Sequence, residues 1–306
     1  MPHQSTWSRL FAHAIDLDAF EHLLTSFFLA QRHSSELPER GSIVLALDGK
    51  TLRGTIPAGH SRGVHLLAAS LPEQGIVLAQ APVERKENEI VVAPTLLARL
   101  PLAGVVVVGD ALHAQRATCR SIVEANGDYL WFVDKNQPSL LWDISQLFEE
   151  PKVEKGWSLP PTDFERARSC ESGHGRVEER VLTASRMLVD YTPWPYLQQV
   201  FKLERRWWDR NGAHVEVRYG VTSLPRQVAG PEALLRIARA EWGIENGLHH
   251  RRDVTLREDA CQLRRGRGPQ TNAALNNLVV SLVVGSGATN LFDRLLARAA
   301  SAAPAP

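Results

Sequence analysis

Two short, fully apolar runs, each followed by an aspartate, are the clearest hydrophobic pattern in this chain. Ile43–Leu47 leads directly into Asp48, and Val105–Val108 leads through one glycine into Asp110. Continuous apolar runs of this length are typical of strands that are buried on both faces of a sheet. We therefore expect two central strands, each ending at an acidic residue.

The segments around these runs alternate between strand and helix patterns. Two more strands are expected on either side of a Pro-Glu-Gln-Gly turn, and helices then separate the strands that follow. The order β-β-β-α-β-α-β-α predicts an α/β fold with a ribonuclease-H-like mixed sheet and flanking helices. Besides the two apolar runs, the expected elements are strands at 64–71, 75–82 and 129–133 and helices at 91–100, 116–126 and 139–148.

The helical pattern disappears after about residue 150. Strand patterns replace it, and Asn211-Gly212 is a strong hairpin turn signal between two of them. We interpret this stretch as a β-rich insertion into the α/β fold. The expected strands are 176–184, 200–207 and 214–222, and the next helix is 232–250.

Composition is that of an ordinary globular protein, with 44% hydrophobic and 23% charged residues among 306. No apolar run approaches the roughly 20 residues that a membrane helix needs. The N-terminus has no basic segment followed by an apolar stretch, so we expect a cytoplasmic protein without a membrane partner. The three cysteines are too far apart for a zinc site or a disulfide framework.

Charge is unevenly distributed although the net charge is only +1. The first 150 residues carry 12 Lys+Arg against 17 Asp+Glu, and the remainder carries 23 against 17. Such polarity is expected if one face contacts phosphates, although many proteins that never bind DNA show it too.

The two strand-end aspartates suit metal chemistry. In a sheet with crossover helices, ligand sites gather at the carboxyl ends of strands, so Asp48 and Asp110 could face one crevice. Mg²⁺ prefers oxygen ligands, and paired ions can activate both oxygens of a phosphodiester exchange. The alternative is structural, because Asp-Gly is a frequent turn and Gly-Asp-Ala can cap a helix.

A third acidic candidate lies on the helix expected at 232–250. Glu241 and Glu245 are four residues apart and share one helical face. Histidines and arginines follow directly, whereas Trp242 and Leu248 must be buried. A solvated charged face is the alternative interpretation of this helix.

At this point four blocks of the sequence resemble one family, the H-repeat-associated (ISAs-type) DDE transposases of insertion sequences. They occur in order over nearly the whole chain, from about residue 5 to about residue 284. Each block alone is weak evidence for this family, whereas all four in register are strong evidence for it. The blocks are Asp-Gly-Lys-Thr-Leu-Arg-Gly from 48, Gly-Asp-Ala-Leu-His-Ala-Gln from 109, Trp-Gly-Ile-Glu-Asn-Gly-Leu-His from 242 and Arg-Glu-Asp-Ala from 257.

The resemblance implies an enzyme, a polynucleotidyl transferase that uses Mg²⁺ or Mn²⁺ to cleave and transfer DNA strands at insertion-sequence ends. Its partner would be double-stranded DNA, and it would act as a homodimer in the synaptic complex of a bacterial cell. By position, Asp48, Asp110 and Glu245 are the catalytic, metal-binding acids. The residues expected to contact DNA or orient the acids are Lys50, Arg53, His113, Gln115, Asn246, His249, Arg252, Arg264 and Arg265.

The resemblance also implies a domain organisation, in which the β-rich insertion precedes the last catalytic helix. Residues 1–40 would be the remnant of an N-terminal helical region, in a copy that looks N-terminally shortened. The ribonuclease-H-like catalytic core would comprise 41–150 and 226–290, the insertion 151–225 and a flexible tail 291–306.

Two other functions stay open. At the catalytic helix, Glu241 and His250 replace residues that are usually His and Trp, which favours a catalytically impaired DNA-binding remnant as one alternative. A nuclease of the same fold that acts on RNA–DNA hybrids is the other. In the insertion, Arg205-Arg206-Trp207-Trp208 could stack on an unpaired base, or the two aromatic side chains could simply be core.

Overall fold

The structure is a computed structural model that describes residues 3–31, 38–84, 88–149, 161–173, 176–210, 212–244 and 251–285. The chain divides into two compact units, and each is described by itself below. The first unit comprises Met1–Glu36, Leu45–Leu100 and Ala240–Pro306, and the second comprises Leu37–Val44 and Pro101–Arg239.

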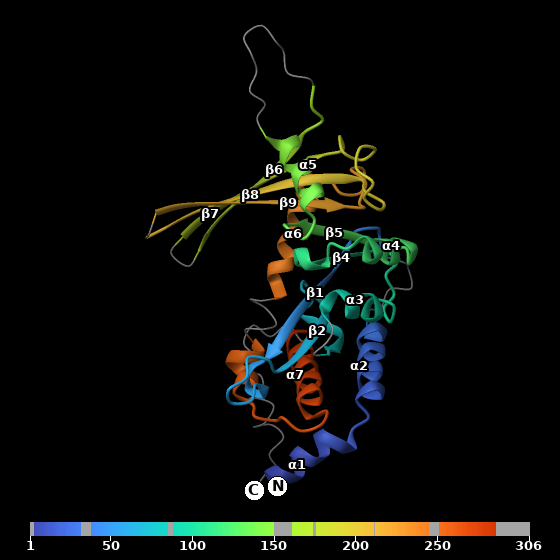
Figure 1. Cartoon of the computed structure of the whole chain (residues 1–306), viewed down its shortest axis with the longest axis vertical. Helices are drawn as coiled ribbons and strands as arrows, with labels where there is room; N and C mark the ends of the chain where they lie inside the picture. Colours follow the sequence, from blue (N-terminus) through green and yellow to red (C-terminus); the bar gives the residue numbers. More distant parts are fainter. Residues whose placement is uncertain are drawn as a thin grey trace. The chain divides into compact units, whose positions relative to one another are not determined.

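The secondary structure follows the predicted order, β-β-β-α-β-α-β-α and then a β-rich insertion (Figure 1). Parallel and antiparallel strand pairs both occur, so the predicted ribonuclease-H-like α/β fold with a mixed sheet is confirmed. The limits of the domains proposed from the sequence stay a prediction. None of the described helices is both long and apolar enough to cross a membrane.

The first unit contains an antiparallel meander of three strands. Strand β1 (Ile43–Leu52) pairs with β2 (Val64–Leu71), and β2 pairs with β3 (Ile76–Val83). All three strands carry runs of buried apolar side chains. The Pro-Glu-Gln-Gly turn predicted from the sequence joins β2 to β3, where Gly75 has the positive φ that glycine tolerates best.

Helices pack on both faces of this meander. Leu52 and Leu66 pack with Ala273 of α7 (Gly268–Gly285) on one face. On the other face, α3 (Glu89–Leu97) contacts β2 and β3. Helix α2 (Leu17–Gln31) packs on β3 and α7, and it is preceded by α1 (Gln4–Arg9) and by a π-helical turn, Leu10–Ala14.

The second unit is built on a parallel strand pair. Strand β4 (Val105–Gly109) is buried at every residue and pairs in parallel with β5 (Asp128–Val133), also fully buried. Helix α4 (Arg116–Glu124) makes the crossover between them, and α5 (Pro138–Phe148) follows β5. The apolar run predicted as a central strand is therefore confirmed.

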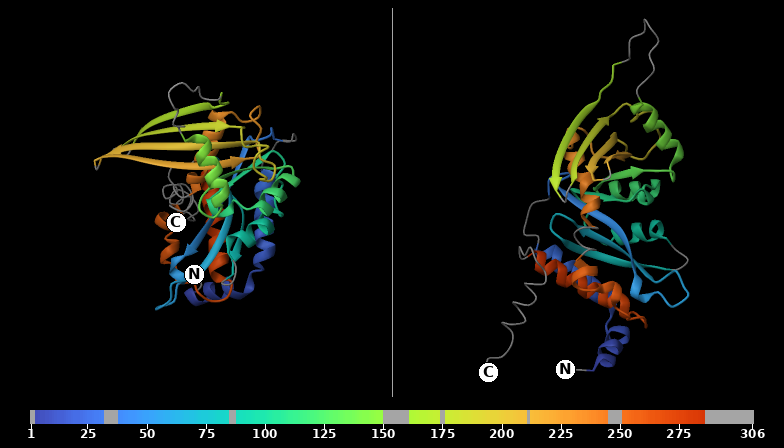
Figure 2. Two further views of the ribbon diagram at one scale, coloured as in Figure 1. Left: turned by 45° about the horizontal axis from the view of Figure 1, so that its top comes forward. Right: turned by 90° about the vertical axis from the view of Figure 1, so that its left-hand side faces the viewer.

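The β-rich insertion extends the sheet of the second unit. Strand β9 pairs antiparallel with β5, and the order continues through β8 and β7 to β6. Figure 2 shows these strands as one twisted sheet, with α5 packed against β8 and β9. Strand β6 was not expected, because its exposed charged residues hide the strand pattern. The bounds are β6 Glu165–Gly173, β7 Arg176–Ser185, β8 Gln199–Asp209 and β9 Gly212–Thr222, and α6 follows at Pro231–Ile244.

Candidate active site

Strand β1 does not end at Asp48, which corrects the sequence prediction. The strand continues for four more residues, and Asp48 lies opposite Ala68 in the middle of the β1–β2 ladder. The polar residues after Asp48 stay in the strand because β2 pairs with each of them as far as Leu52. Side chains alternate between the two faces of a strand, so Asp48 shares its face with Lys50 and Leu52.

Lys50 is held by two acidic side chains of the same unit. Its side chain is 9% exposed, and its Nζ lies 2.6 Å from Oδ2 of Asp253 and 3.7 Å from Oδ1 of Asp259. Asp259 also accepts a hydrogen bond from the backbone N–H of Arg53, at 3.2 Å. The Arg53 side chain itself is 80% exposed and lies 3.6 Å from Asp259. Lys50 is therefore engaged within the protein, whereas Arg53 faces solvent.

The opposite face of β1 carries a chain of three polar side chains. Thr51 Oγ1 lies 2.8 Å from Nδ1 of His65, and His65 Nε2 lies 2.8 Å from Oε1 of Glu89 at the start of α3. A Cβ at Gly49 would lie 2.0 Å from that same Glu89 oxygen. A side chain at position 49 would therefore displace the His65–Glu89 pair, which lies directly on the Gly49 backbone.

Residues 251–264 pack against the end of β1. Arg252 is 1% exposed and its guanidinium Nε and Nη2 lie 2.8 and 2.7 Å from one carboxylate oxygen of Glu258, which is equally buried. The other Glu258 oxygen accepts a hydrogen bond from Asn276 of α7, at 2.8 Å. Arg264 Nε donates to the carbonyl oxygen of Gly54 at 2.8 Å. A phosphate could reach the Arg252 guanidinium only after the buried ion pair opens, so its assignment as a DNA contact stays a prediction.

Asp110 follows β4 directly in the second unit, as predicted. It is exposed, and its Oδ1 accepts the backbone N–H of Ala111 at 2.6 Å, which caps a 3-10 turn at Ala111–His113. Two amide side chains fix this turn from the loop after β5. Asn136 donates to the carbonyl of Ala111 at 2.7 Å, and Gln137 donates to the carbonyl of Ala114 at 2.9 Å.

Two other residues of the same sequence block, His113 and Gln115, are less exposed than Asp110. His113 is 1% exposed, and its ring lies 6.1 Å from that of Trp131 on β5. Gln115 donates through its amide to the carbonyl of Leu112 at 3.1 Å and precedes α4. Their roles as contacts to DNA or to the acids stay predictions, and buried His113 could act only through its neighbours.

The third acid lies outside the described residues. Glu245, Asn246 and His249 all fall in the gap between 244 and 251, so their predicted roles are untested. Glu241, the rival acid, lies in the last described turn of α6. Among the residues that the structure describes, no group of three or more His, Cys, Asp or Glu side chains could hold a metal ion.

Exposed arginines line one loop of the first unit. Arg264 and Arg265 are exposed in the loop before α7, as predicted for phosphate contacts. Arg267 follows and reaches Asp18 at 3.1 Å, where both side chains are more than half exposed. Arg264 donates to the carbonyl of Gly54, so these two exposed arginines, Arg53 and Arg264, both lie at the end of β1.

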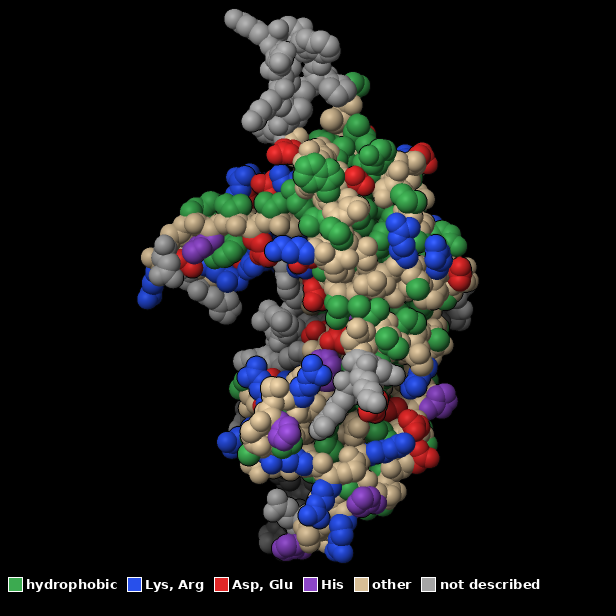
Figure 3. All heavy atoms as spheres, in the orientation of Figure 1, with side chains coloured by type: hydrophobic (Ala, Val, Ile, Leu, Met, Phe, Trp, Pro, Cys, Tyr) green, Lys and Arg blue, Asp and Glu red, His purple; other side chains and the backbone are tan. Residues whose placement is uncertain are grey.

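The aromatic pair of the insertion is divided between the two faces of its sheet. Trp207 stacks on His214 with ring centroids 4.9 Å apart, and Arg205 lies 4.8 Å over Trp207. Trp208 points to the opposite face and is 44% exposed. Figure 3 shows that part of the sheet with hydrophobic side chains along one side and charged ones along the other. Only Trp208 of the pair is open to a base, so the four residues do not act as one stacking platform.

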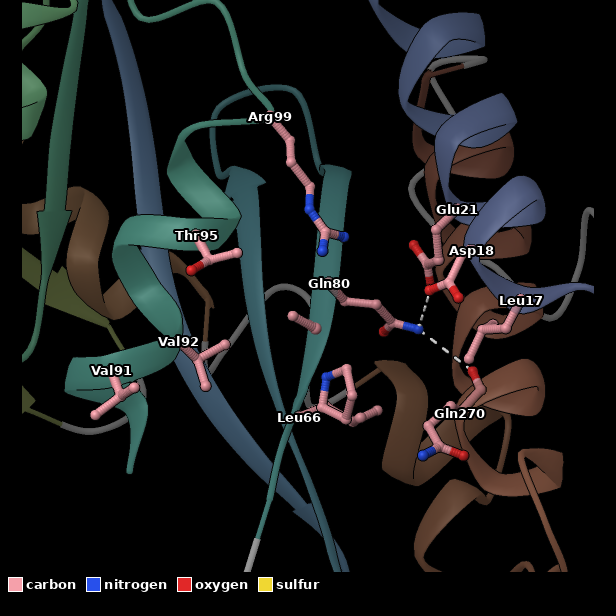
Figure 4. Close-up of a pocket in the computed structure, with 12 residues that line it drawn as sticks. Leu17, Asp18, Glu21, Leu66, Gln80, Val91, Val92, Thr95, Arg99 and Gln270 are labelled. Atoms are coloured by element: carbon pink, nitrogen blue, oxygen red, sulfur yellow. Dashed lines mark hydrogen bonds between the residues drawn. The ribbon is translucent and has the colours of Figure 1, made fainter. Parts of the chain in front are cut away.

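A pocket of about 360 Å³ lies elsewhere in the first unit, between α2, α3 and β3 (Figure 4). Burial raises the pKa of Glu21 to about 7, and the hydrogen bond from Gln80 at 2.6 Å opposes that rise. Gln80 also accepts a hydrogen bond from Asn277 at 2.8 Å, so α2, β3 and α7 are linked through neutral amides. No predicted site residue lines this pocket.

Sequence reasoning missed the acidic partners of the site's cations. Asp253 and Glu258 were not expected to pair with Lys50 and Arg252, although the Arg-Glu-Asp-Ala block had drawn attention to residues 257–260. Pairs separated by about two hundred residues leave no local signal. The one local hint is that Asp253 and Glu258 follow shortly after basic residues that were predicted to contact DNA.

Comparisons with known proteins fit this arrangement of blocks. A family model described as "Transposase DDE domain" matches residues 39–282. "Putative protein YbfL" of Escherichia coli K12 is 30% identical over an alignment of 253 positions that covers 78% of this chain and 64% of that protein. "H repeat-associated putative transposase YhhI" of the same strain is 29% identical with the same coverages. A structure of the piggyBac transposase synaptic complex with hairpin DNA aligns with 95% of this chain and 60% of that chain, with a TM-score of 0.46 and 10% identity.

The chain spans about 64% of the length of YbfL and of YhhI. The family match itself covers well over half of the chain. The resemblance first carried by four short blocks is thereby confirmed, and this chain belongs to the DDE transposase family.

Proposed function

We propose that this chain is a DDE transposase that cleaves and transfers DNA strands at insertion-sequence ends in a metal-dependent reaction. The catalytic acids are Asp48, Asp110 and Glu245. The observation that carries the proposal is the family match over residues 39–282, which includes all three acids. The alternative is a remnant that binds DNA without cleaving it, which the residues around Glu245 first suggested.

The setting of Asp110 supports its role as a metal ligand. A fully buried strand delivers it to an exposed turn, and amide–carbonyl hydrogen bonds fix that turn. Among the described residues no lysine or arginine forms an ion pair with Asp110, and an exposed carboxylate of this kind suits a hard divalent ion. Asp48, partly buried on a regular strand, adds a second oxygen donor from a rigid element.

The donor chemistry of the three acids fits Mg²⁺ or Mn²⁺. Carboxylate oxygens are the ligands that these hard ions prefer, and Asp48, Asp110 and Glu245 would hold them. A bound ion supplies Lewis-acid activation of the attacking and leaving oxygens. The chain's own task is to fix the carboxylates and to bind the DNA backbone.

Exposed arginines of the first unit are proposed to bind the DNA phosphates. Arg53, Arg264 and Arg265 are exposed, and guanidinium groups bind phosphate through paired hydrogen bonds. Because such contacts release counterions, binding should weaken steeply as salt increases. A homodimer on double-stranded DNA remains part of the proposal, since strand transfer must join two DNA segments.

The test is a nicking assay on duplexes taken from the DNA that borders the gene on each side. Asp110→Asn is compared with Asp134→Asn, a matched control. Asp134 follows β5 as Asp110 follows β4, is equally exposed and accepts the next backbone N–H in the same way, at 2.7 Å. With Mn²⁺, we expect Asp110→Asn to reduce nicking by at least about a hundredfold, whereas Asp134→Asn stays near the wild-type rate.

Three other outcomes would change the conclusion. Equal nicking by wild type and Asp110→Asn would remove Asp110 from the site. Equal losses in both variants would point to a general effect of strand-end acids. Salt-dependent DNA binding by the wild type, with no metal-dependent nicking, would support the impaired remnant instead.

A further inference from the structure

We propose that Lys50, Asp253 and Asp259 form an ion-pair clamp that holds the segment following Glu245 against strand β1, and so positions the third acid. These three are positioning residues, not catalytic ones. The inference rests on the proposed function, because it takes Asp48 and Glu245 as metal ligands. It assigns Lys50 a role different from the phosphate contact that its sequence block implies.

The clamp begins with the charge of Lys50. Its Nζ lies 2.6 Å from Asp253 and 3.7 Å from Asp259, and the lysine side chain is only 9% exposed. The other oxygen of Asp253, Oδ1, is buried without a hydrogen-bond partner among the described residues. The Asp253 side chain as a whole is 31% exposed, so the buried charge of the pair is that of Lys50, and a buried charge that loses its partner is strongly disfavoured.

Backbone contacts fix the same segment beside the clamp. Asp259 accepts the N–H of Arg53 at 3.2 Å, and Arg264 donates to the carbonyl of Gly54 at 2.8 Å. A Cβ at Gly54 would lie 2.1 Å from the carbonyl oxygen of Cys261. Such an approach is open only to glycine, so the chain after β1 and residues 259–261 are in direct backbone contact.

The far side of the segment is anchored to α7. The buried Arg252–Glu258 pair reaches Asn276 of that helix through a hydrogen bond of 2.8 Å. Between these anchors Arg257 has a φ of 52°, a left-handed conformation that non-glycine residues rarely adopt. A strained backbone persists only where its surroundings fix it, so residues 251–264 have one imposed conformation rather than that of a loose loop.

The position of the clamp explains why it matters for the reaction. Lys50 is two residues after Asp48 and on the same face of β1. Asp253 is eight residues after Glu245 in the chain. The clamp therefore joins the strand that carries the first acid to the segment that follows the third acid in the sequence. Its loss should weaken metal binding, because catalytic groups must be held within a fraction of an ångström.

Charge reversal tests the clamp without assuming activity. We would compare wild type, Lys50→Glu, Asp253→Lys and the double variant in the full chain. Hydrogen exchange reports whether residues 251–264 stay protected, and Mn²⁺ binding is measured by electron paramagnetic resonance. We expect each single variant to lose protection in 251–264 and to bind Mn²⁺ at least about tenfold more weakly. The double variant should recover most of both losses, because the pair is restored in reverse.

A charge-free variant provides an independent test. Gly54→Ala should push residues 259–261 away and should also weaken Mn²⁺ binding, although no charge has changed. Gly173→Ala is the matched control, since a Cβ there meets nothing within 4 Å. If Gly54→Ala exposes 251–264 to exchange but leaves Mn²⁺ affinity at the wild-type value, the positioning role is overturned.

Binding to end DNA separates the clamp from a phosphate contact. With Ca²⁺ in place of Mn²⁺, we expect Lys50→Glu to bind the duplex within about threefold of wild type and with the same salt dependence. A large loss of affinity with a shallower salt dependence, not recovered in the double variant, would overturn the clamp in favour of a phosphate contact. A wild type that binds no Mn²⁺ would instead count against the proposed function, and it would overturn the positioning role as well. Hydrogen exchange would still decide whether the ion pairs hold residues 251–264.

Discussion

The two described acids of the proposed site are held in place by different kinds of contact. Around Asp48, in the first unit, the surroundings are charged: Lys50 pairs with two aspartates, and a buried Arg252–Glu258 pair lies in the adjoining segment. Around Asp110, in the second unit, the contacts are neutral amide–carbonyl hydrogen bonds after an apolar strand.

The difference shows how local sequence relates to mechanism. The Asp110 turn is defined by residues within about thirty positions of each other, and its own strand delivers it. The strand of Asp48 is completed by residues about two hundred positions away. The surroundings of Asp48 therefore depend on the correct placement of a segment that is distant in the sequence. They should respond more strongly to loss of charge than the Asp110 turn.

The largest effect is expected from Glu258→Gln in the charged region. This change leaves the Arg252 guanidinium, 1% exposed, without its counter-charge, and breaking a buried pair from one side costs about 3–5 kcal/mol. Urea unfolding measures the loss. The control is Asp18→Asn, which removes an exposed ion pair with Arg267 and should cost less than about 1 kcal/mol. Equal small losses would mean that the Arg252 pair is solvated in solution.

Glu21 of α2 is a partly buried carboxylate that accepts a hydrogen bond from the neutral amide of Gln80. Burial raises the pKa of Glu21 to about 7, from an ordinary value of 4.5. Between these values the unfolded chain releases the proton while the folded chain retains it, so stability falls as pH increases from about 4.5 to about 7.

Glu21→Gln should therefore stabilise the protein by about 2–3 kcal/mol at pH 8 and have little effect at pH 4. Thermal unfolding across this pH range is the measurement. A stability difference between variant and wild type that does not change with pH would contradict the assigned burial of the charge.

Gly49→Ala tests the tight packing beside Asp48. The new methyl group would meet Glu89 at 2.0 Å and displace the His65–Glu89 pair, at a cost of about 1–3 kcal/mol. Chemical denaturation compares it with Gly173→Ala, where the added Cβ enters open space. If the two substitutions behave alike, the His65–Glu89 pair moves away without cost and does not constrain the backbone next to Asp48.

The smallest effect is expected in the neutral region. Asn136→Ala removes one amide–carbonyl hydrogen bond to the Asp110 turn, which is worth about 1 kcal/mol. Because neither partner is charged, the loss should be the same at low and at high salt. Unfolding in 0.05 and 0.5 M NaCl, at about a threefold difference in Debye screening length, checks this. A loss that shrinks with salt would show that the turn depends on charge after all.

The sequence was sufficient for the elements whose pattern is local. The apolar runs identified β4 and the first half of β1, and the turn signals placed β2, β3 and the β8–β9 hairpin. In these elements most of the apolar side chains that form the pattern in the sequence are the ones buried in the structure. Burial of apolar side chains therefore explains both the sequence pattern and the strand.

The sequence was insufficient wherever distant partners decide the structure. The polar residues after Asp48 looked like the end of a strand, because only their pairing with β2 and with Asp253 keeps them in it. Strand β6 was missed for a similar reason, since its charged residues are balanced across the sheet by Arg180 and Glu179. The roles predicted for the basic residues stay predictions, and nothing local distinguishes an exposed arginine such as Arg53 from a buried one such as Arg252.

The most direct test of the central claim is to map the metal ions on the chain itself. Fe²⁺ in place of Mg²⁺, with added hydrogen peroxide as oxidant and ascorbate to regenerate Fe²⁺, generates hydroxyl radicals that cut the backbone close to where the ion is bound. If Asp48, Asp110 and Glu245 hold the ions, the wild type should be cut near all three, and Asp110→Asn should reduce every cut together. Cuts near Asp48 that persist unchanged in Asp110→Asn, or cuts confined to other parts of the chain, would contradict the shared metal site.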